Sequence, residues 1–180
     1  MFNKKLDDIV AQLEASYYET PEIFFTEPDW HFPSRSAIVD ILKALRRLMF
    51  PRYFGSEAPC ESGPKYFIGD MMTQIEVGLR EQVIEALMFR DGHDLSVEEL
   101  NERASEICSN FFYSLPRLHA TLLTDVQAAF DGDPAAASKE EVIFSYPGFF
   151  AIFVYRIAHE FYIQDVPLIP RIMTEYAHAG

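Results

Sequence analysis

The chain has 180 residues, of which 49% are hydrophobic, so it is long enough and apolar enough to bury a sizeable core. Aspartate and glutamate number 28 against 15 lysines and arginines, which gives a net charge of −13 at pH 7. Phosphate binding needs clustered lysine and arginine, so this balance argues against a nucleic-acid partner. The composition predicts a folded acidic protein of one domain, or of one domain with a short addition.

The first part of the chain combines an amphipathic helix with an aromatic connector. Residues 5–18 carry Leu6 and Ile9 in an apolar stripe at helical spacing. This stripe is expected to pack on its own domain, with packing on another subunit as the less favoured reading. Residues 20–33 are interrupted by prolines and contain the only tryptophan, Trp30, so they predict a connector that covers part of a core.

The cysteines and the amino terminus indicate the cellular compartment in which the protein is expected. The two cysteines are Cys60, in a predicted loop, and Cys108, on a predicted helix; they form neither a Cys-x-x-Cys pair nor a disulfide framework. The first residues lack the apolar segment of a secretory signal. We therefore expect a cytoplasmic protein.

Two helices are predicted in the next part of the chain, on either side of a loop. Ser34 is a good cap for a helix with an apolar face that runs to Met49. Residues 51–64 are rich in proline and glycine and predict a loop. Residues 67–90 then predict a long helix with one face in the core.

A further helical pattern fills the middle of the chain. Ser96 and Glu99 have the spacing of a capping box at its start, and the pattern ends at Gly132. Pro116 is expected to kink or break it, because a proline inside a helix removes one hydrogen bond and clashes with the preceding turn.

The last part of the chain predicts two helices. Pro147 opens an apolar helix, whose run from Phe149 to Tyr155 is too short for the roughly 20 residues of a membrane span. Pro167 and Pro170 separate it from a final helix. With no alternating strand pattern and no internal repeat, the chain predicts an all-α fold of about six to eight helices.

The ionisable residues do not form the sequence motif of a hydrolase, of a phosphate-binding loop or of a metal site. The five histidines are scattered and form no close ligand pair, and no Gly-x-Ser-x-Gly motif is present. His119 and His159 lie beside apolar residues on predicted helices, where histidines are usually core or boundary residues. We therefore assign no metal ligand and no catalytic residue.

Five short motifs follow one another in the last third of the chain. They are Asp-Pro-Ala (133–135), Tyr-Pro-Gly-Phe (146–149), Tyr-Arg-Ile-Ala-His (155–159), Pro-Leu-Ile-Pro-Arg (167–171) and Ala-His (177–178). In this order they resemble the amino-terminal helical region of bacterial serine O-acetyltransferase, and residues 33–35 and 41–55 extend the resemblance toward the amino terminus. Each motif is weak alone, but the ordered set is specific.

The resemblance implies an enzyme of cysteine biosynthesis that transfers acetyl from acetyl-CoA to the hydroxyl of L-serine. In that family the helical region precedes a left-handed parallel β-helix of hexapeptide repeats, which holds the catalytic histidine, its aspartate partner and the CoA groove. These repeats are not among the 180 residues. We therefore expect an excised or truncated amino-terminal part that is inactive alone, with acetyl-CoA as a co-substrate of the intact enzyme and no tightly bound cofactor.

Asp133 stands at the predicted division of the chain. By resemblance, residues 1–132 form the amino-terminal helical domain, and residues 133–180 form a helical segment that leads into the β-helix domain. The resemblance also implies that the Asp133 carboxylate contacts the ammonium group of the substrate serine, a contact that suits a charged acceptor. Without the resemblance, Asp133 reads as a turn residue at a helix end.

The resemblance also implies the partners. Family members are homo-oligomers, trimers or hexamers, and a carboxy-terminal tail outside these residues can bind cysteine synthase; no membrane partner is expected. One alternative of another class remains open. The chain is then a non-catalytic assembly module whose apolar helical faces hold subunits together.

Overall fold

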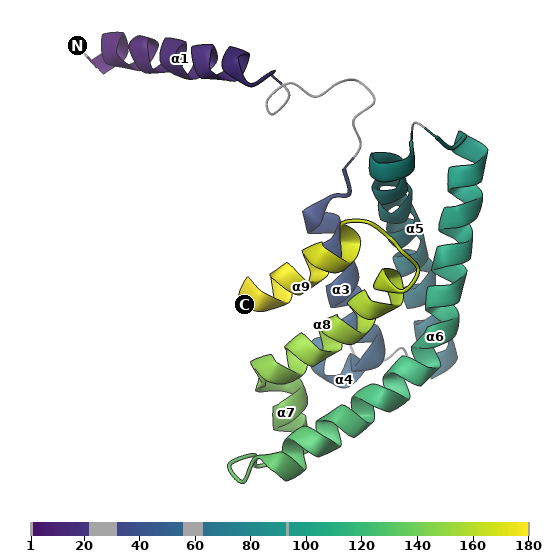
Figure 1. Cartoon of the computed structure of the whole chain (residues 1–180). Coiled ribbons are helices and arrows are strands. Elements are labelled where there is room, and N and C mark those ends of the chain that lie inside the picture. Colours follow the sequence, from purple (N-terminus) through teal and green to yellow (C-terminus); the bar gives the residue numbers. More distant parts are fainter. Residues whose placement is uncertain (1, 22–31, 56–62, 93, 180) are drawn as a thin grey trace. The chain divides into compact units, whose positions relative to one another are not determined.

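The computed structural model describes residues 2–21, 32–55, 63–92 and 94–179 (Figure 1). These residues form eight helices and no strand, which confirms the predicted all-α class for the described part of the chain. The chain divides into two compact units, Met1–His31 and Phe32–Gly180. Trp30 and Cys60, which were considered above, lie outside the described residues.

In the described residues of the first unit, 2–21, the structure shows the helix α1 (Phe2–Glu19). Its apolar stripe forms as predicted, but the unit does not bury it: Leu6 is 49% exposed and Leu13 is 53% exposed. Whether the stripe packs on its own domain or on another subunit stays a prediction.

The second unit holds the buried core. It contains α3 (Arg35–Met49), α4 (Pro51–Phe54), α5 (Pro64–Asp91), α6 (Val97–Gly132), α7 (Lys139–Ser145), α8 (Pro147–Tyr162) and α9 (Ile169–Ala179). Helix α5 packs against α3 and α6, while α8 packs against α6 and α9. Leu45, Leu79 and Phe153 are among the side chains with no exposed surface.

The helix starts follow the capping signals of the sequence. The Ser34 side chain accepts a hydrogen bond from the Ala37 amide at 3.3 Å, at the start of α3. At the start of α6, the Ser96 side chain accepts from the Glu99 amide while Glu99 Oε2 accepts from the Ser96 amide at 2.8 Å, so the predicted capping box is confirmed.

Three details of the predicted helices were wrong. The predicted loop 51–64 contains the short helix α4, and α5 begins at Pro64 rather than at residue 67. Both starts use a proline at the first helical position, where a missing amide hydrogen costs nothing. Residues 139–145, for which no helix was predicted, form α7.

Pro116 lies inside α6 and does not break it. The helix bends along its length (Figure 1), which agrees with a kink rather than a break. Leu115 and Leu118, on either side of the proline, are buried in the core. Their packing holds the helix together across the position that lacks a hydrogen bond.

Helix α8 is the most apolar element of the core. Phe153, Ile157 and Phe161 are fully buried, and the Phe161 ring lies 4.6 Å from the Phe111 ring of α6, measured between centroids. No single helix among the described residues is long and apolar enough to cross a membrane. Helices α7 and α8 pass that test only as a pair, and they meet at a bend of 71°.

Candidate substrate-binding site

Asp133 caps the carboxyl end of α6, where the chain turns toward α7. Its carboxylate is half-buried and accepts two hydrogen bonds. Oδ1 accepts from the Ala135 amide at 2.9 Å, and Oδ2 accepts from the Tyr146 hydroxyl at 2.7 Å. The structure therefore places Asp133 at a helix end, as the sequence predicts, and joins it to a residue of the Tyr-Pro-Gly-Phe motif.

The loop that carries Asp133 is held by its own hydrogen bonds. The Ala136 amide donates to the Asp133 carbonyl at 3.0 Å, and the Ala137 amide donates to Glu141 Oε2 at 2.8 Å. The Ser138 side chain caps α7 by accepting from the Glu141 amide at 3.2 Å. These bonds fix the loop between α6 and α7, and with it the direction of the Asp133 side chain.

Tyr146 lies at the junction of α7 and α8, where it is the last capping residue of α7 and the first capping residue of α8. Its amide donates to the Val142 carbonyl at 3.3 Å, and its carbonyl accepts from the Phe150 amide at 3.1 Å. Pro147 follows it as the first residue of α8. The sequence shows this tyrosine as part of a motif but does not reveal its contact with Asp133. Its position directly before Pro-Gly is the sequence feature that could have pointed to it.

The electrostatics of the two groups follow from their hydrogen bond. The Tyr146 hydroxyl, and then the Ala135 amide, lower the pKa of Asp133 below its ordinary value, because both donate to the charged form. The same contact raises the pKa of Tyr146 to about 12, since the Asp133 carboxylate accepts a hydrogen bond from the hydroxyl and its charge opposes a phenolate. At neutral pH, Asp133 is charged and Tyr146 is a neutral donor.

Two carboxylates of α6 and α8 are paired with arginines of the facing helix. Asp125 of α6 accepts two hydrogen bonds from Arg156 of α8, at 2.5 and 2.6 Å. Glu160 of α8, which is buried, accepts from Arg117 of α6 at 2.8 Å. These contacts tie α8 to α6.

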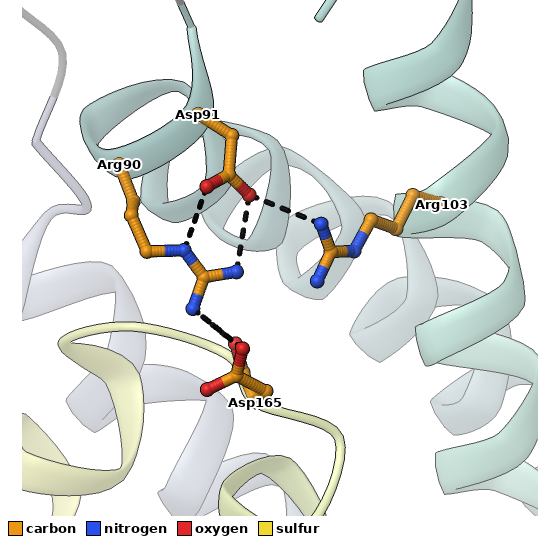
Figure 2. Close-up of polar contacts among 4 residues, drawn as sticks. All are labelled: Arg90, Asp91, Arg103 and Asp165. Atoms are coloured by element: carbon orange, nitrogen blue, oxygen red, sulfur yellow. Dashed lines mark hydrogen bonds and ion pairs between the residues drawn. The ribbon is translucent and has the colours of Figure 1, made fainter. Parts of the chain in front are cut away.

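A charged cluster joins α5, α6 and the turn after α8 (Figure 2). Asp91 accepts from Arg90 Nε at 2.7 Å and from Arg103 Nη1 at 3.1 Å. Arg90 Nη1 also donates to the backbone carbonyl and the carboxylate of Asp165, at 2.8 and 2.9 Å. Asp165 and Leu168 have φ of 57° and 60°, in the left-handed region. The contacts of Arg90 with Asp165 therefore hold a turn in a backbone conformation that these residue types disfavour.

His119 lies at the boundary of the core, as predicted, whereas His159 does not. His119 is half-buried, with its ring 6.2 Å from the Phe50 ring. His159 is exposed and stacks between Tyr155 and Tyr162. It does not join the local network with Arg156 and Glu160 that sequence spacing favours, because those two side chains reach across to α6.

The cavities lie away from the Asp133 carboxylate. The most apolar one, of about 510 Å³, lies between α8 and α9 and is lined by Tyr155, Tyr162 and Leu168, among others. Another, of about 390 Å³, is lined by His178, Ala151 and Pro147, the residue that follows Tyr146. Neither of these two cavities has Asp133 in its lining.

Among the residues that the structure describes, Cys108 and the side-chain types that bind metals offer no second site. Burial raises the pKa of the Cys108 thiol to about 12, so it is not a nucleophile at neutral pH. No group of three or more histidine, cysteine, aspartate or glutamate side chains among the described residues has the geometry of a metal site.

Sequence comparison places the chain among serine acetyltransferases. The family described as "Serine acetyltransferase, N-terminal" matches residues 70–153. A "Serine acetyltransferase, plasmid" of Synechococcus elongatus is 36% identical over 179 residues, which is 97% of this chain and 56% of that protein. A "Serine acetyltransferase" of Bacillus subtilis is 41% identical over 54 residues, or 30% of this chain and 25% of that protein.

Comparison of structures gives the same result. The crystal structure of native serine acetyltransferase 1 from Entamoeba histolytica matches 99% of this chain and 60% of its own, with 25% identity and a TM-score of 0.62. The same enzyme in complex with L-cysteine has the same fold, with 24% identity, a TM-score of 0.62, and coverage of 97% of this chain and 60% of its own. The chain thus spans somewhat more than half the length of the Synechococcus and Entamoeba proteins, and nearly all of it is similar to serine acetyltransferases, with residues 70–153 matching the amino-terminal family model.

Proposed function

We propose that this chain is the amino-terminal part of a serine O-acetyltransferase, which transfers acetyl from acetyl-CoA to the hydroxyl of L-serine. The observation that carries the proposal is the 36% identity to a serine acetyltransferase along 97% of the chain. The catalytic base and the acetyl-CoA groove are assigned to the part of the relatives that this chain does not cover. Acetyl-CoA is a substrate in this proposal, and the 180 residues alone are expected to be inactive.

Within this enzyme, the Asp133 carboxylate binds the ammonium group of serine. The Tyr146 hydroxyl and the Ala135 amide both donate to the Asp133 carboxylate and lower its pKa, so it keeps its negative charge. A charged acceptor forms a strong hydrogen bond with an ammonium donor. Fixing that end of serine orients the hydroxyl for reaction, because a positioned reactant loses less entropy in the transition state.

Serine kinetics of the Asp133→Asn variant test this role in the intact enzyme. The substitution keeps the shape of the side chain and removes its charge. We expect kcat/KM for serine to fall roughly ten- to hundredfold, while KM for acetyl-CoA stays unchanged. Asp131→Asn is the matched control, since Asp131 is an exposed carboxylate of the same helix end that accepts from Gln127 at 2.7 Å.

A substrate without the ammonium group sharpens the test. 3-Hydroxypropanoate has the hydroxyl and carboxylate of serine but no amino group. If Asp133 binds the ammonium, Asp133→Asn weakens reaction with serine and leaves reaction with 3-hydroxypropanoate nearly unchanged. Equal losses with both substrates contradict the assignment.

The assembly module remains as a second candidate, and one observation favours it. The stripe of α1 is largely exposed, with Ile9 and Leu13 both 53% exposed. Apolar stripes of this kind often mark contacts with other subunits. A module without a substrate contact predicts that Asp133→Asn leaves serine kinetics unchanged, so the same experiment separates the two candidates.

A further inference from the structure

We infer that Tyr146 is a positioning residue for the serine substrate: its hydroxyl fixes the orientation of the Asp133 carboxylate and leaves the negative charge of that carboxylate available to the substrate ammonium. This inference rests on the proposed function, because it concerns the carboxylate that is proposed to bind serine. It assigns a role to a residue that lies outside the Asp-Pro-Ala motif.

The geometry supports the orienting role. A carboxylate held by one donor can still rotate about its last side-chain bond, whereas donors on both oxygens stop that rotation. Asp133 has one donor on each oxygen, the Ala135 amide on Oδ1 and the Tyr146 hydroxyl on Oδ2. The amide comes from the loop of Asp133 itself, so only Tyr146 ties the carboxylate to the start of α8.

Tyr146 is rigid enough to act as this tie. Its amide and carbonyl are both hydrogen-bonded, to Val142 and Phe150, and its partly buried side chain packs against the hydrophobic core. A donor on a fixed backbone holds its acceptor in one place at a smaller cost in entropy than a donor on a free surface side chain.

The contacts leave room for the substrate. A carboxylate has about four acceptor positions, and the two donors use two of them, so roughly two remain for an ammonium group. A tyrosine hydroxyl donates without cancelling the charge. The hydrogen bond itself keeps the proton on Tyr146 and the negative charge on Asp133, since it raises the pKa of Tyr146 to about 12 and lowers that of Asp133.

Tyr146→Phe in the intact enzyme tests the inference, because it removes the hydroxyl and keeps the ring. We expect KM for serine to rise about three- to tenfold, with kcat within about twofold of the parent and KM for acetyl-CoA unchanged. Tyr113→Phe is the matched control, since Tyr113 is 85% exposed on α6. A loss that falls on kcat and on acetyl-CoA as well, together with a lower Tm, indicates a purely structural role and overturns the inference.

The double variant Asp133→Asn/Tyr146→Phe gives a second readout. If Tyr146 acts through Asp133, the double variant binds serine no more weakly than Asp133→Asn alone. Additive losses mean that Tyr146 acts independently of the carboxylate, and they overturn the inference.

The same variants separate the two ways of failing. If Asp133→Asn lowers kcat/KM for serine and Tyr146→Phe behaves as the parent, the inference is wrong and the proposed function stands. If Asp133→Asn leaves serine kinetics unchanged, the proposed role of Asp133 is wrong, and the inference falls with it.

Discussion

Two regions of the second unit hold their carboxylates in different ways. Between α6 and α8, Asp125 meets Arg156 and Glu160 meets Arg117, so each negative charge faces a positive one. At the corner between α6 and α7, about two turns further along the same helix, Asp133 meets only a hydroxyl and an amide. The described residues form no ion pair with Asp133.

If Asp133 binds serine as proposed, this difference separates a structural use of a carboxylate from a binding use. An arginine neutralises the carboxylate and locks two helices together, since its planar group donates in a fixed direction. Neutral donors fix the carboxylate in place but leave its charge for a cation from outside. Perturbed carboxylates alone therefore do not mark a binding site; the charge of their donors distinguishes the two uses.

Breaking the arginine pair should have the largest effect on stability. Arg156→Ala leaves the half-buried Asp125 without its partner, so we expect a loss of about 1.5–3 kcal/mol in the free energy of unfolding. For a protein of this size that loss corresponds to a Tm lower by about 3–12 °C. Urea unfolding and thermal melting measure it, and serine kinetics of the remaining folded enzyme should be normal.

An apolar replacement of the whole pair serves as the control. Asp125→Leu/Arg156→Met removes both charges and keeps apolar volume between α6 and α8, so it should recover most of the lost stability. A double variant as unstable as Arg156→Ala contradicts the view that the unpaired carboxylate causes the loss.

Acid should have the next largest effect, on the charged cluster of Asp91, Arg90 and Arg103. Arg90, and then Arg103, lower the pKa of Asp91, so its charged form stabilises the folded chain. That contribution is fully present above the ordinary aspartate pKa of about 4 and is lost as pH falls through the lowered value. We expect Asp91→Asn to cost about 1 kcal/mol at pH 7, and we expect this cost to shrink as pH falls through the lowered pKa of Asp91. A cost that stays constant with pH argues against this charge–charge origin.

Removing the charge of Asp133 should have the smallest effect on stability. Asp133→Asn is expected to shift Tm by less than about 2 °C, because it changes an accessible carboxylate that pairs with no arginine. Melting of the variant beside Arg156→Ala measures the contrast. A drop in Tm as large as that of Arg156→Ala, with normal serine kinetics, would make Asp133 a structural helix-end residue.

Much of the fold was predictable because the helices begin with local signals. Ser34 and Ser96 cap helices through their own neighbours in sequence, so the residues that determine the start are visible in the chain. Helix α7 was missed because seven residues give fewer than two full turns of apolar periodicity. Pro116 shows where local signals fail, because the packing that keeps α6 continuous across this proline comes from other helices.

The site was predictable only in part, for a similar reason. The Asp-Pro-Ala motif pointed to Asp133, but the residue that holds its carboxylate is 13 positions away, and no periodicity connects a helix end to the start of another helix. Arg156 was read beside His159 and Glu160 because all three lie within about one turn. Its partner is Asp125 on another helix, which spacing along one helix does not reveal.

The length of α6 has a consequence for how this chain can change in evolution. The helix runs without a break through 36 residues, about 54 Å, from the capping box at Ser96 to Asp133. Deleting or inserting one residue inside it would turn everything beyond, Asp133 and Tyr146 together, by about 100° relative to the helices that pack on the first part of α6. Related chains can therefore exchange side chains along the exposed face of α6, while changes in length are confined to the turns before Ser96 and after Asp133.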